Sequence, residues 1–172
     1  MSCVLVIGTP KSGTHAAAAY LRTQGIRALH EVRGRDGCVS AWLSVPDWWN
    51  PAASRCGVRS DYEPDTVIHL VRYPLDAIAS LAAFEHPAFW QWQERHTGLG
   101  YEPGNLEFFA HFWVRWNHLC SAQTEKRLRC EDLTGVPFNA NWATPNKKPV
   151  AWSDLGPFVS EVRRMAERFG YN

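Results

Sequence analysis

The chain has 172 residues, 45 % of them apolar and 20 % charged, which excludes a disordered or fibrous protein and fits a single domain over residues 1–172. Its 18 Lys and Arg against 17 Asp and Glu give a formal net charge of +1, so nothing indicates general binding to nucleic acid, and an anion site would have to be local. The nine tryptophans are many for this length and must line either the core or a pocket.

The sequence carries no sign of export or of a membrane span. No run approaches the roughly 20 apolar residues that cross a bilayer, and the apolar start over residues 3–7 is too short for a signal peptide. The five cysteines are scattered without a C-x-x-C pair, so we expect reduced thiols that serve as packing and no zinc site. These features predict a cytoplasmic protein.

Short apolar runs alternate with helical patterns in the first half of the chain. Residues 3–8 form a continuous apolar run rich in β-branched side chains, which is typical of a strand buried on both faces. A helix from Thr14 to Gln24 follows and ends at Gly25. The next predicted elements are a strand over 26–32, a short helix over 36–45, a loop over 46–65, a strand over 66–72 and a helix from Pro74 to about Phe84.

Two helices are predicted in the second half. The first carries an apolar stripe from Phe108 to Cys120 at helical spacing, and the last carries one from Leu155 to Phe169. Ser153 is expected to cap the last helix and Gly170 to end it. With a candidate strand from Arg127 to Cys130 between them, the alternation predicts an α/β domain with a mainly parallel sheet.

The loop after the first strand has the composition of an anion site. Gly8 and Gly13 bracket it and allow tight turns that present backbone N–H groups, and the next helix adds the positive end of its dipole. The spacing matches the G-x-x-x-x-G frame of a nucleotide-triphosphate loop. Thr14 and His15 replace the following Lys and Ser/Thr of a kinase, and the lysine of this loop is Lys11. The loop therefore predicts a phosphate-like ligand without the usual magnesium arrangement.

Two motifs resemble those of sulfotransferases that use 3′-phosphoadenosine 5′-phosphosulfate (PAPS). Pro10-Lys11-Ser12-Gly13-Thr14 looks like the loop that holds the 5′-phosphosulfate. Residues 68–81 resemble the 3′-phosphate motif, with Arg72 at the end of a strand and Ser80 in the next helix. An arginine at the carboxyl end of a parallel strand points into the crevice where α/β sheets bind ligands, and its guanidinium can grip a phosphate.

Weaker similarities extend over most of the chain. Residues 129–133 are similar to the family's R-x-E-D-L segment, residues 152–171 to its last helix and closing Gly-Tyr, and residues 30–40 to a stretch of small bacterial-type members. The resemblance implies a P-loop NTPase-like three-layer fold of the sulfotransferase type. Two features common in the family are missing, an aromatic residue just after the lysine loop and a C-terminal Arg/Gly-rich loop.

The resemblance also implies roles for individual residues. Lys11 would stabilise charge on the leaving phosphate, and no metal or redox cofactor would be required. The backbone N–H groups of Ser12, Gly13 and Thr14 would hold the 5′-phosphate together with the Thr14 hydroxyl. The residues expected to bind PAPS, or its product adenosine 3′,5′-bisphosphate, are Pro10, Lys11, Ser12, Gly13, Thr14, His15, Arg72 and Ser80, with Lys147 and Lys148 as the nearest substitute for the missing basic loop.

The acceptor must lose a proton, so a general base is expected. Glu31 is favoured because it lies in the region where carbohydrate-type members of the family carry a glutamate, and His30 is second. On a strand these neighbours would face opposite sides. In a structural alternative, the carboxylate has a structural role, for instance by pairing with Arg33, Arg35 or Lys11. The weaker candidates are His15, His111 and the mid-strand His69, which is expected to be a core residue.

The aromatic residues divide into two groups. Trp113 and Trp116 fit the apolar stripe of the long helix and are expected in the core. Three roles stay open for the others: contact with a small-molecule or glycan acceptor, a homodimer contact, or packing. These others are Trp48, Trp49, Trp90 and Trp92.

The leading hypothesis is an enzyme that transfers the sulfonate of PAPS to a hydroxyl or amine acceptor, with a carbohydrate as one candidate. A P-loop nucleotide kinase is an alternative, but the G-K-[ST] sequence it needs is absent from the loop. A non-catalytic protein that binds PAPS or a nucleotide is another, and the intact Lys11 disfavours it.

Overall fold

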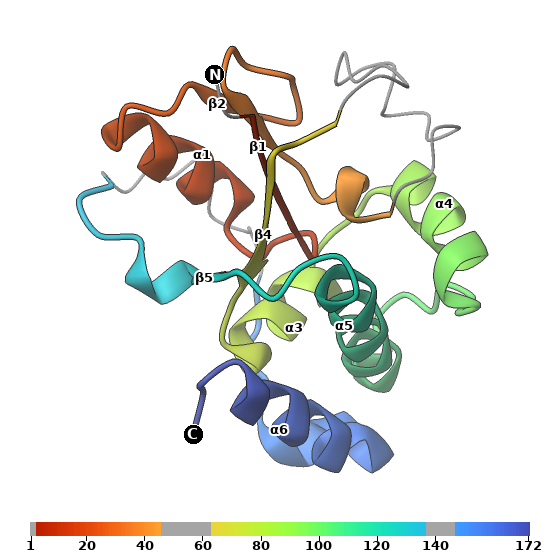
Figure 1. The fold of residues 1–172 in the computed structure, drawn as a ribbon. Helices are drawn as coiled ribbons and strands as arrows, with labels where there is room; N and C mark the ends of the chain where they lie inside the picture. Colours follow the sequence, from red (N-terminus) through yellow and green to blue (C-terminus); the bar gives the residue numbers. More distant parts are fainter. Residues whose placement is uncertain (1–2, 46–62, 137–146) are drawn as a thin grey trace.

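A central parallel sheet organises the molecule. The computed structural model describes residues 3–45, 63–136 and 147–172. Its five strands run in the order β2-β3-β1-β4-β5, all parallel (Figure 1). Central β1 pairs with β4 along its whole length, from Val4 opposite Thr66 to Gly8 opposite Leu70. The strands are β1 (Val4–Gly8), β2 (Ala28–His30), β3 (Gly37–Val39), β4 (Thr66–Val71) and β5 (Arg127–Arg129).

Helices and 3₁₀ turns connect the strands and continue the chain beyond them. α1 follows β1 and lies on one side of the sheet, and the other α-helices of the described residues lie on the opposite side (Figure 1). The α-helices are α1 (Thr14–Thr23), α3 (Pro74–Ala82), α4 (Pro87–Thr97), α5 (Leu106–Ser121) and α6 (Val159–Arg168). The 3₁₀ segments are η1 (Trp42–Ser44), η2 (Cys130–Asp132) and η4 (Trp152–Phe158).

The side chains of β1 explain why the sheet is covered on both faces. Every residue of this strand is buried, and successive side chains of a strand point to opposite faces. Val4 and Val6 pack in the cluster that includes Leu21 of α1, whereas Leu5 and Ile7 belong to the larger cluster formed with α3, α4, α5 and α6. An apolar strand of this kind needs a helical layer on each side, which gives a three-layer α/β arrangement.

Most predicted elements are confirmed, and one is wrong. The predicted strands over 26–32, 66–72 and Arg127 to Cys130 are present, although all three are shorter than expected, the first by the most. The predicted helix over 36–45 is wrong, because this segment contains strand β3 followed by the turn η1. A strand of three residues is too short for its hydrophobic period to be read from the sequence. The predicted loop over 46–65 lies mostly outside the described residues.

The last helix begins differently from the prediction. Ser153 is not its cap, because residues Trp152–Phe158 form the 3₁₀ segment η4, at whose start the Ala151 N–H donates to the Asp154 carboxylate at 2.8 Å. A kink at Gly156, where φ is +53°, interrupts η4, and α6 begins directly after this segment at Val159. The predicted end at Gly170 is confirmed, since this residue adopts a φ of +80° directly after the helical cap.

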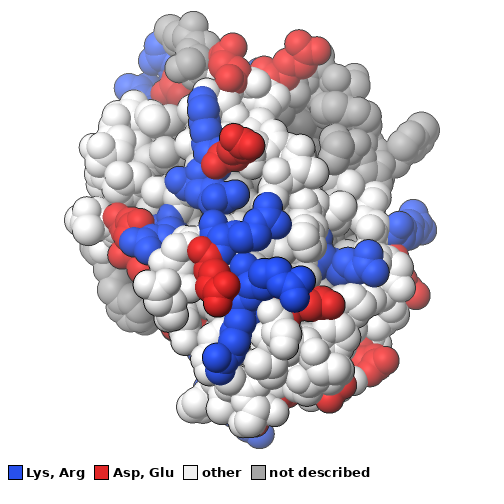
Figure 2. Space-filling model, turned by 60° about the horizontal axis from the view of Figure 1, so that its bottom comes forward, with Lys and Arg blue, Asp and Glu red and all other residues white. Residues whose placement is uncertain are grey.

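The surface charge is arranged more unevenly than the net charge suggests. Figure 2 shows Lys and Arg gathered in a band across one face, with Asp and Glu beside them. In edge strand β5, Arg127 and Arg129 donate to the backbone carbonyls of Arg168 and Gly170 at 3.1 and 3.2 Å, which holds the end of α6 against the sheet.

None of the helices in the described parts of the chain is both long and apolar enough to cross a membrane.

The buried tryptophans of α5 should dominate the stability of the larger cluster. Trp113 is 1 % exposed, and Trp113→Ala would leave a large cavity beneath the sheet, so we expect the free energy of unfolding to fall by about 3–5 kcal/mol. Val32→Ala, at a side chain that is 46 % exposed, should change it by less than about 0.5 kcal/mol. Urea denaturation followed by tryptophan fluorescence and circular dichroism measures both, and equal effects would contradict this assignment of the core.

Candidate functional site

A cavity of about 580 Å³ lies at the carboxyl end of the sheet. Each of the five strands leads into its wall: the loop after β1, residues 30–31 at β2, residues 41–42 after β3, Arg72 after β4 and Cys130 after β5. The chain leaves β1 toward β2 and β3 on one side and returns to β4 on the other. Open α/β sheets bind ligands at such a reversal, outside the carboxyl ends of the strands.

The loop after β1 presents Lys11 to the cavity in an unusual backbone conformation. Lys11 has a φ of +64°, and Gly13 has a φ of +96° at the N-cap of α1. A Cβ atom on Gly13 would collide with the Cys130 sulfur, and the positive φ itself favours glycine at this position. A left-handed lysine costs about 1 kcal/mol or more, which marks Lys11 as a residue held in place by its surroundings. Burial lowers the pKa of its ammonium group.

Ser12 lies differently from its neighbours. Pro10, Lys11, Gly13, Thr14 and His15 line the cavity. The Ser12 side chain is fully buried, its hydroxyl has no hydrogen-bond partner in the described residues, and its N–H donates to the Thr9 carbonyl at 3.1 Å. The expected contact between the Ser12 N–H and a 5′-phosphate does not fit this arrangement, because the donor is already used inside the turn.

Arg72 connects the second motif to the lysine loop. Its Nη1 donates to the Lys11 carbonyl at 3.0 Å and to the Ser80 hydroxyl at 3.4 Å. All three residues line the cavity, so the structure brings the two sequence motifs together.

The two lysines before the last helix differ in position. Lys147 lines the cavity and forms an ion pair with Asp76 at the start of α3. Lys148 is exposed and is not among the described residues that line the cavity. Only Lys147 is therefore placed to meet a ligand there.

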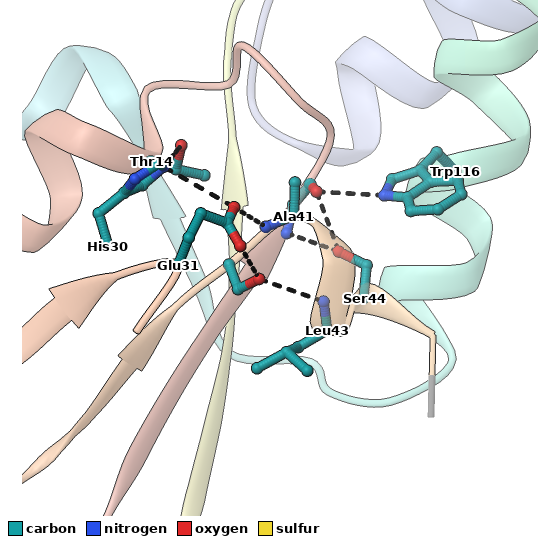
Figure 3. Close-up of polar contacts among 9 residues, drawn as sticks. Thr14, His30, Glu31, Ala41, Leu43, Ser44 and Trp116 are labelled. Atoms are coloured by element: carbon teal, nitrogen blue, oxygen red, sulfur yellow. Dashed lines mark hydrogen bonds and ion pairs between the residues drawn. The ribbon is translucent and has the colours of Figure 1, made fainter. Parts of the chain in front are cut away.

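His30 and Glu31 both face the cavity, in contrast to the expectation for neighbours on a strand. β2 ends at His30, and Glu31 has a φ of +53°, which turns its side chain toward that of His30. Glu31 Oε1 lies 3.7 Å from His30 Nε2, and the same nitrogen lies 2.9 Å from Thr14 Oγ1. The chain thus places these two candidate residues beside the first turn of α1 (Figure 3).

The Glu31 carboxylate holds the turn after β3. Its Oε1 accepts the Ala41 N–H at 3.1 Å, and its Oε2 accepts a short hydrogen bond from the Ser40 hydroxyl. The Ser40 hydroxyl in turn accepts the Leu43 N–H at 3.3 Å. These contacts support a structural role of the Glu31 carboxylate, whose partners include a hydroxyl and a backbone N–H of the turn after β3.

A second group of bonds ties the same turn to the end of β1. The Ser44 hydroxyl accepts the Gly8 N–H at 3.1 Å and donates to the Gly8 carbonyl at 2.9 Å, and Trp116 Nε1 donates to that carbonyl at 3.1 Å (Figure 3). The start of the lysine loop is thereby attached both to η1 and to α5.

Two histidines share one side of the cavity. The rings of His15 and His30 are stacked, with centroids 3.6 Å apart and planes at 25°. Burial, then the charges of His15 and Lys11, lower the pKa of His30 to about 4. Burial and Lys11 lower the pKa of His15 as well. The close stacking agrees with the lowered pKa of both rings, because two charged imidazoles at this distance would repel each other.

Aromatic side chains form another part of the wall. Trp42, Phe84, His86 and Phe89 line the cavity, and the Lys11 ammonium lies 5.0 Å from the centroid of the Phe84 ring. Trp42 contacts His86 and Phe89 edge-on, with centroids 5.5 and 5.1 Å apart. A ligand with an apolar ring can therefore contact this wall next to the cationic part of the cavity.

Trp90 and Trp92 belong to the core. They lie in α4 and are 1 % and 4 % exposed. Trp90 stacks on Tyr101 with centroids 4.9 Å apart, and Trp92 packs behind Trp42 at 5.1 Å. Of the three roles that the sequence left open for them, their burial supports packing. Trp48 and Trp49 lie outside the described residues.

Trp42 and Cys130 line the cavity but are missing from the residues selected from the sequence. Each follows the carboxyl end of a strand. Recognition of β3 would have identified Trp42, and the predicted strand from Arg127 to Cys130 could have identified Cys130.

The remaining candidates lie away from the cavity lining. His69 is fully buried in β4, where its Nε2 lies 2.9 Å from Asn117 Oδ1 and its Nδ1 lies 3.4 Å from Ser121 Oγ, as expected for a satisfied core histidine. His111 is stacked on Phe158. No three His, Cys, Asp or Glu side chains gather as a metal site would require in residues 3–45, 63–136 and 147–172.

Comparison of the chain with protein-family models, curated proteins and solved structures finds no match. The geometry of the cavity therefore carries the functional proposal.

His69 should make the stability of the protein depend on pH. Burial lowers its pKa from 6.5 to about 4 in the folded chain. Below pH 6.5 the unfolded chain gains a proton that the folded chain does not, so stability is full above pH 6.5 and falls toward pH 4. The loss in the free energy of unfolding that His69 causes should reach about 2–3 kcal/mol near pH 4.5.

Urea denaturation at several pH values would measure this effect. His69→Gln, which does not titrate, should lose less stability on acidification than the wild type, whereas His118→Gln on the exposed side of α5 should follow the wild type. An unchanged pH dependence in His69→Gln would contradict the prediction.

Proposed function

We propose that this protein is a PAPS-dependent sulfotransferase with a P-loop-like fold of the sulfotransferase type. The observation that supports the proposal most is the contact between the two motifs: Arg72 bonds to the Lys11 carbonyl and to Ser80, and all three line one cavity. These are the residues that the resemblance assigns to the two phosphate-containing ends of the cosubstrate.

The charges of the cavity suit a ligand that bears several anionic groups. Lys11, Arg72 and Lys147 line it, and the N-terminus of α1 lies at its loop. A helix N-terminus favours an anion through its unpaired N–H groups and its dipole. The only acidic side chain among the described lining residues is Glu31, which is held by Ser40 and Ala41.

In the proposed reaction, the bond between sulfur and the bridging oxygen breaks, and a bond between sulfur and the acceptor atom forms. The electron pair of the broken bond stays on the phosphate oxygen of adenosine 3′,5′-bisphosphate. Lys11 would stabilise this growing charge, which makes its contribution larger in the transition state than in the ground state. A bound polyanion would also oppose the effect of burial on the Lys11 pKa.

The proton of the acceptor passes to a base on the cavity wall. The sequence favours Glu31, but hydrogen bonds from Ser40 and Ala41 stabilise its charged form and weaken it as a base. The stacked pair of His15 and His30 supplies neutral imidazoles at pH 7, because the pKa of each is lowered. We therefore assign proton acceptance to His15, which lines the cavity and against whose ring His30 is stacked.

Selectivity for the 3′-phosphate tests the role of Arg72. We expect wild-type protein to bind adenosine 3′,5′-bisphosphate more tightly than adenosine 5′-monophosphate in isothermal titration calorimetry. Arg72→Gln should lose most of that preference, about 30-fold or more, because a fixed charged hydrogen bond to the 3′-phosphate disappears. Arg163→Gln, whose guanidinium lies over Trp152, is the matched control and should keep the preference. If the wild type binds neither nucleotide and ATP with magnesium instead raises its melting temperature, a kinase is the better interpretation.

Lys11 should matter more for turnover than for binding. Lys11→Ala should lower the transfer of labelled sulfonate from PAPS by about 10²–10³-fold, because the cation acts on charge that develops in the transition state. Its affinity for adenosine 3′,5′-bisphosphate should fall much less. Lys148→Ala, an exposed lysine, should behave as the wild type in both measurements. A panel of glycans, phenols, lipids and amines as acceptors provides the assay, and full turnover by Lys11→Ala would refute the assigned role.

A further inference from the structure

The contact between Thr14 and His30 can contain only one of two hydrogen bonds. Thr14 Oγ1 and His30 Nε2 are 2.9 Å apart, and either the hydroxyl donates to the nitrogen or an Nε2–H donates to the hydroxyl oxygen. The choice matters for the cavity, because Thr14 is at the first position of α1 and lines it. In the first case its oxygen offers only lone pairs to a bound anion. In the second its proton is available to an anion.

We propose that Glu31 keeps the proton of His30 on Nε2, so that His30 donates to Thr14 and the Thr14 hydroxyl becomes a donor for the bound anion. His30 and Glu31 are then positioning residues of the anion site, and Glu31 is not the general base. For the identity of the ligand, this inference rests on the proposed function; for the proton position, it rests on the geometry alone.

The position of the carboxylate selects the tautomer. Glu31 Oε1 lies 3.7 Å from His30 Nε2, and a negative oxygen there favours the ring form with a proton on that nitrogen. The ring remains uncharged near neutral pH, because burial and the charges of His15 and Lys11 lower its pKa to about 4. A neutral imidazole carries one proton, so a proton on Nε2 leaves the lone pair on Nδ1.

The carboxylate cannot readily turn away from this position. The left-handed backbone of Glu31 and the donors of Ala41 and Ser40 fix both of its oxygens (Figure 3). The stacked ring of His15 restricts His30 from its other face. Thr14, His30 and Glu31 therefore form a series of three side chains in fixed positions. The series starts at the first residue of α1 and ends at the turn after β3.

The tautomer can be read in the ligand-free protein. In a ¹⁵N–¹H correlation spectrum of the histidine side chains near pH 7, with the His30 signals identified from a His30→Gln variant, we expect the proton on Nε2. Glu31→Gln should shift the population toward a proton on Nδ1. Ser40→Ala is the matched control: it removes a hydrogen bond from the same carboxylate but keeps its charge, so the proton should stay on Nε2. A proton on Nδ1 in the wild type would overturn the inference.

The consequence for the anion site is tested by a double-mutant cycle. Thr14→Val, which keeps the shape but removes the hydroxyl, should weaken binding of adenosine 3′,5′-bisphosphate by about 10- to 100-fold, as expected for a hydrogen bond to a charged group. Glu31→Gln should weaken it by a smaller factor. The double variant should be no weaker than Thr14→Val, because both changes act through the same hydroxyl. Additive losses would overturn the inference.

A base at Glu31 predicts a different result. Glu31→Gln would then leave the nucleotide affinity unchanged and abolish only turnover, which would overturn the positioning role. Circular dichroism and melting temperatures check that each variant is folded. If the wild type does not bind adenosine 3′,5′-bisphosphate, the proposed function fails, and the spectrum of the ligand-free protein still decides where His30 carries its proton.

Discussion

The parallel pairing of β1 with β4 is the constraint on which the cavity depends. Their register sets Gly8 opposite Leu70, so the loops that follow both strands leave the sheet at the same level. As a result, the Arg72 guanidinium reaches the Lys11 carbonyl at 3.0 Å, although the two residues are far apart in the sequence. A slip of this register would turn the side chains of β4 to the wrong faces and would separate the two cationic groups of the site.

The packing around β1 makes this edge rigid. Its side chains are buried on both faces, between α1 and the helices of the larger cluster. At its end, the backbone groups of Gly8 bond to Ser44 and Trp116, which connects the lysine loop to η1 and α5. A loop anchored in this way can hold Lys11 in a left-handed conformation, because the surrounding bonds offset the cost. Rigid placement of a charge is what electrostatic stabilisation of a transition state needs.

The cavity divides into regions of different chemistry. Lys11, Arg72 and Lys147 supply positive charge, while Trp42, Phe84 and Phe89 supply an apolar wall. His30 and Glu31 lie on the wall as well and connect Thr14, at the start of α1, to the turn that carries Trp42. This arrangement would suit the proposed reaction, in which an anionic group donor and a separate acceptor meet. It also gathers three cationic side chains at one cavity of a chain whose net charge is +1.

The sequence by itself determined the α/β class, most of the strands and the loop with Lys11, because continuous apolar runs, helical periods and glycine spacing are local patterns. The resemblance of residues 68–81 to a family motif also indicated Arg72 and Ser80. Only the tertiary structure decided that strand β3 puts Trp42 on the cavity wall, that Ser12 turns inward, and that Trp90 and Trp92 are core residues. The shared orientation of His30 and Glu31 also depended on it, because a left-handed residue breaks the alternation that a strand implies and no local pattern announces it.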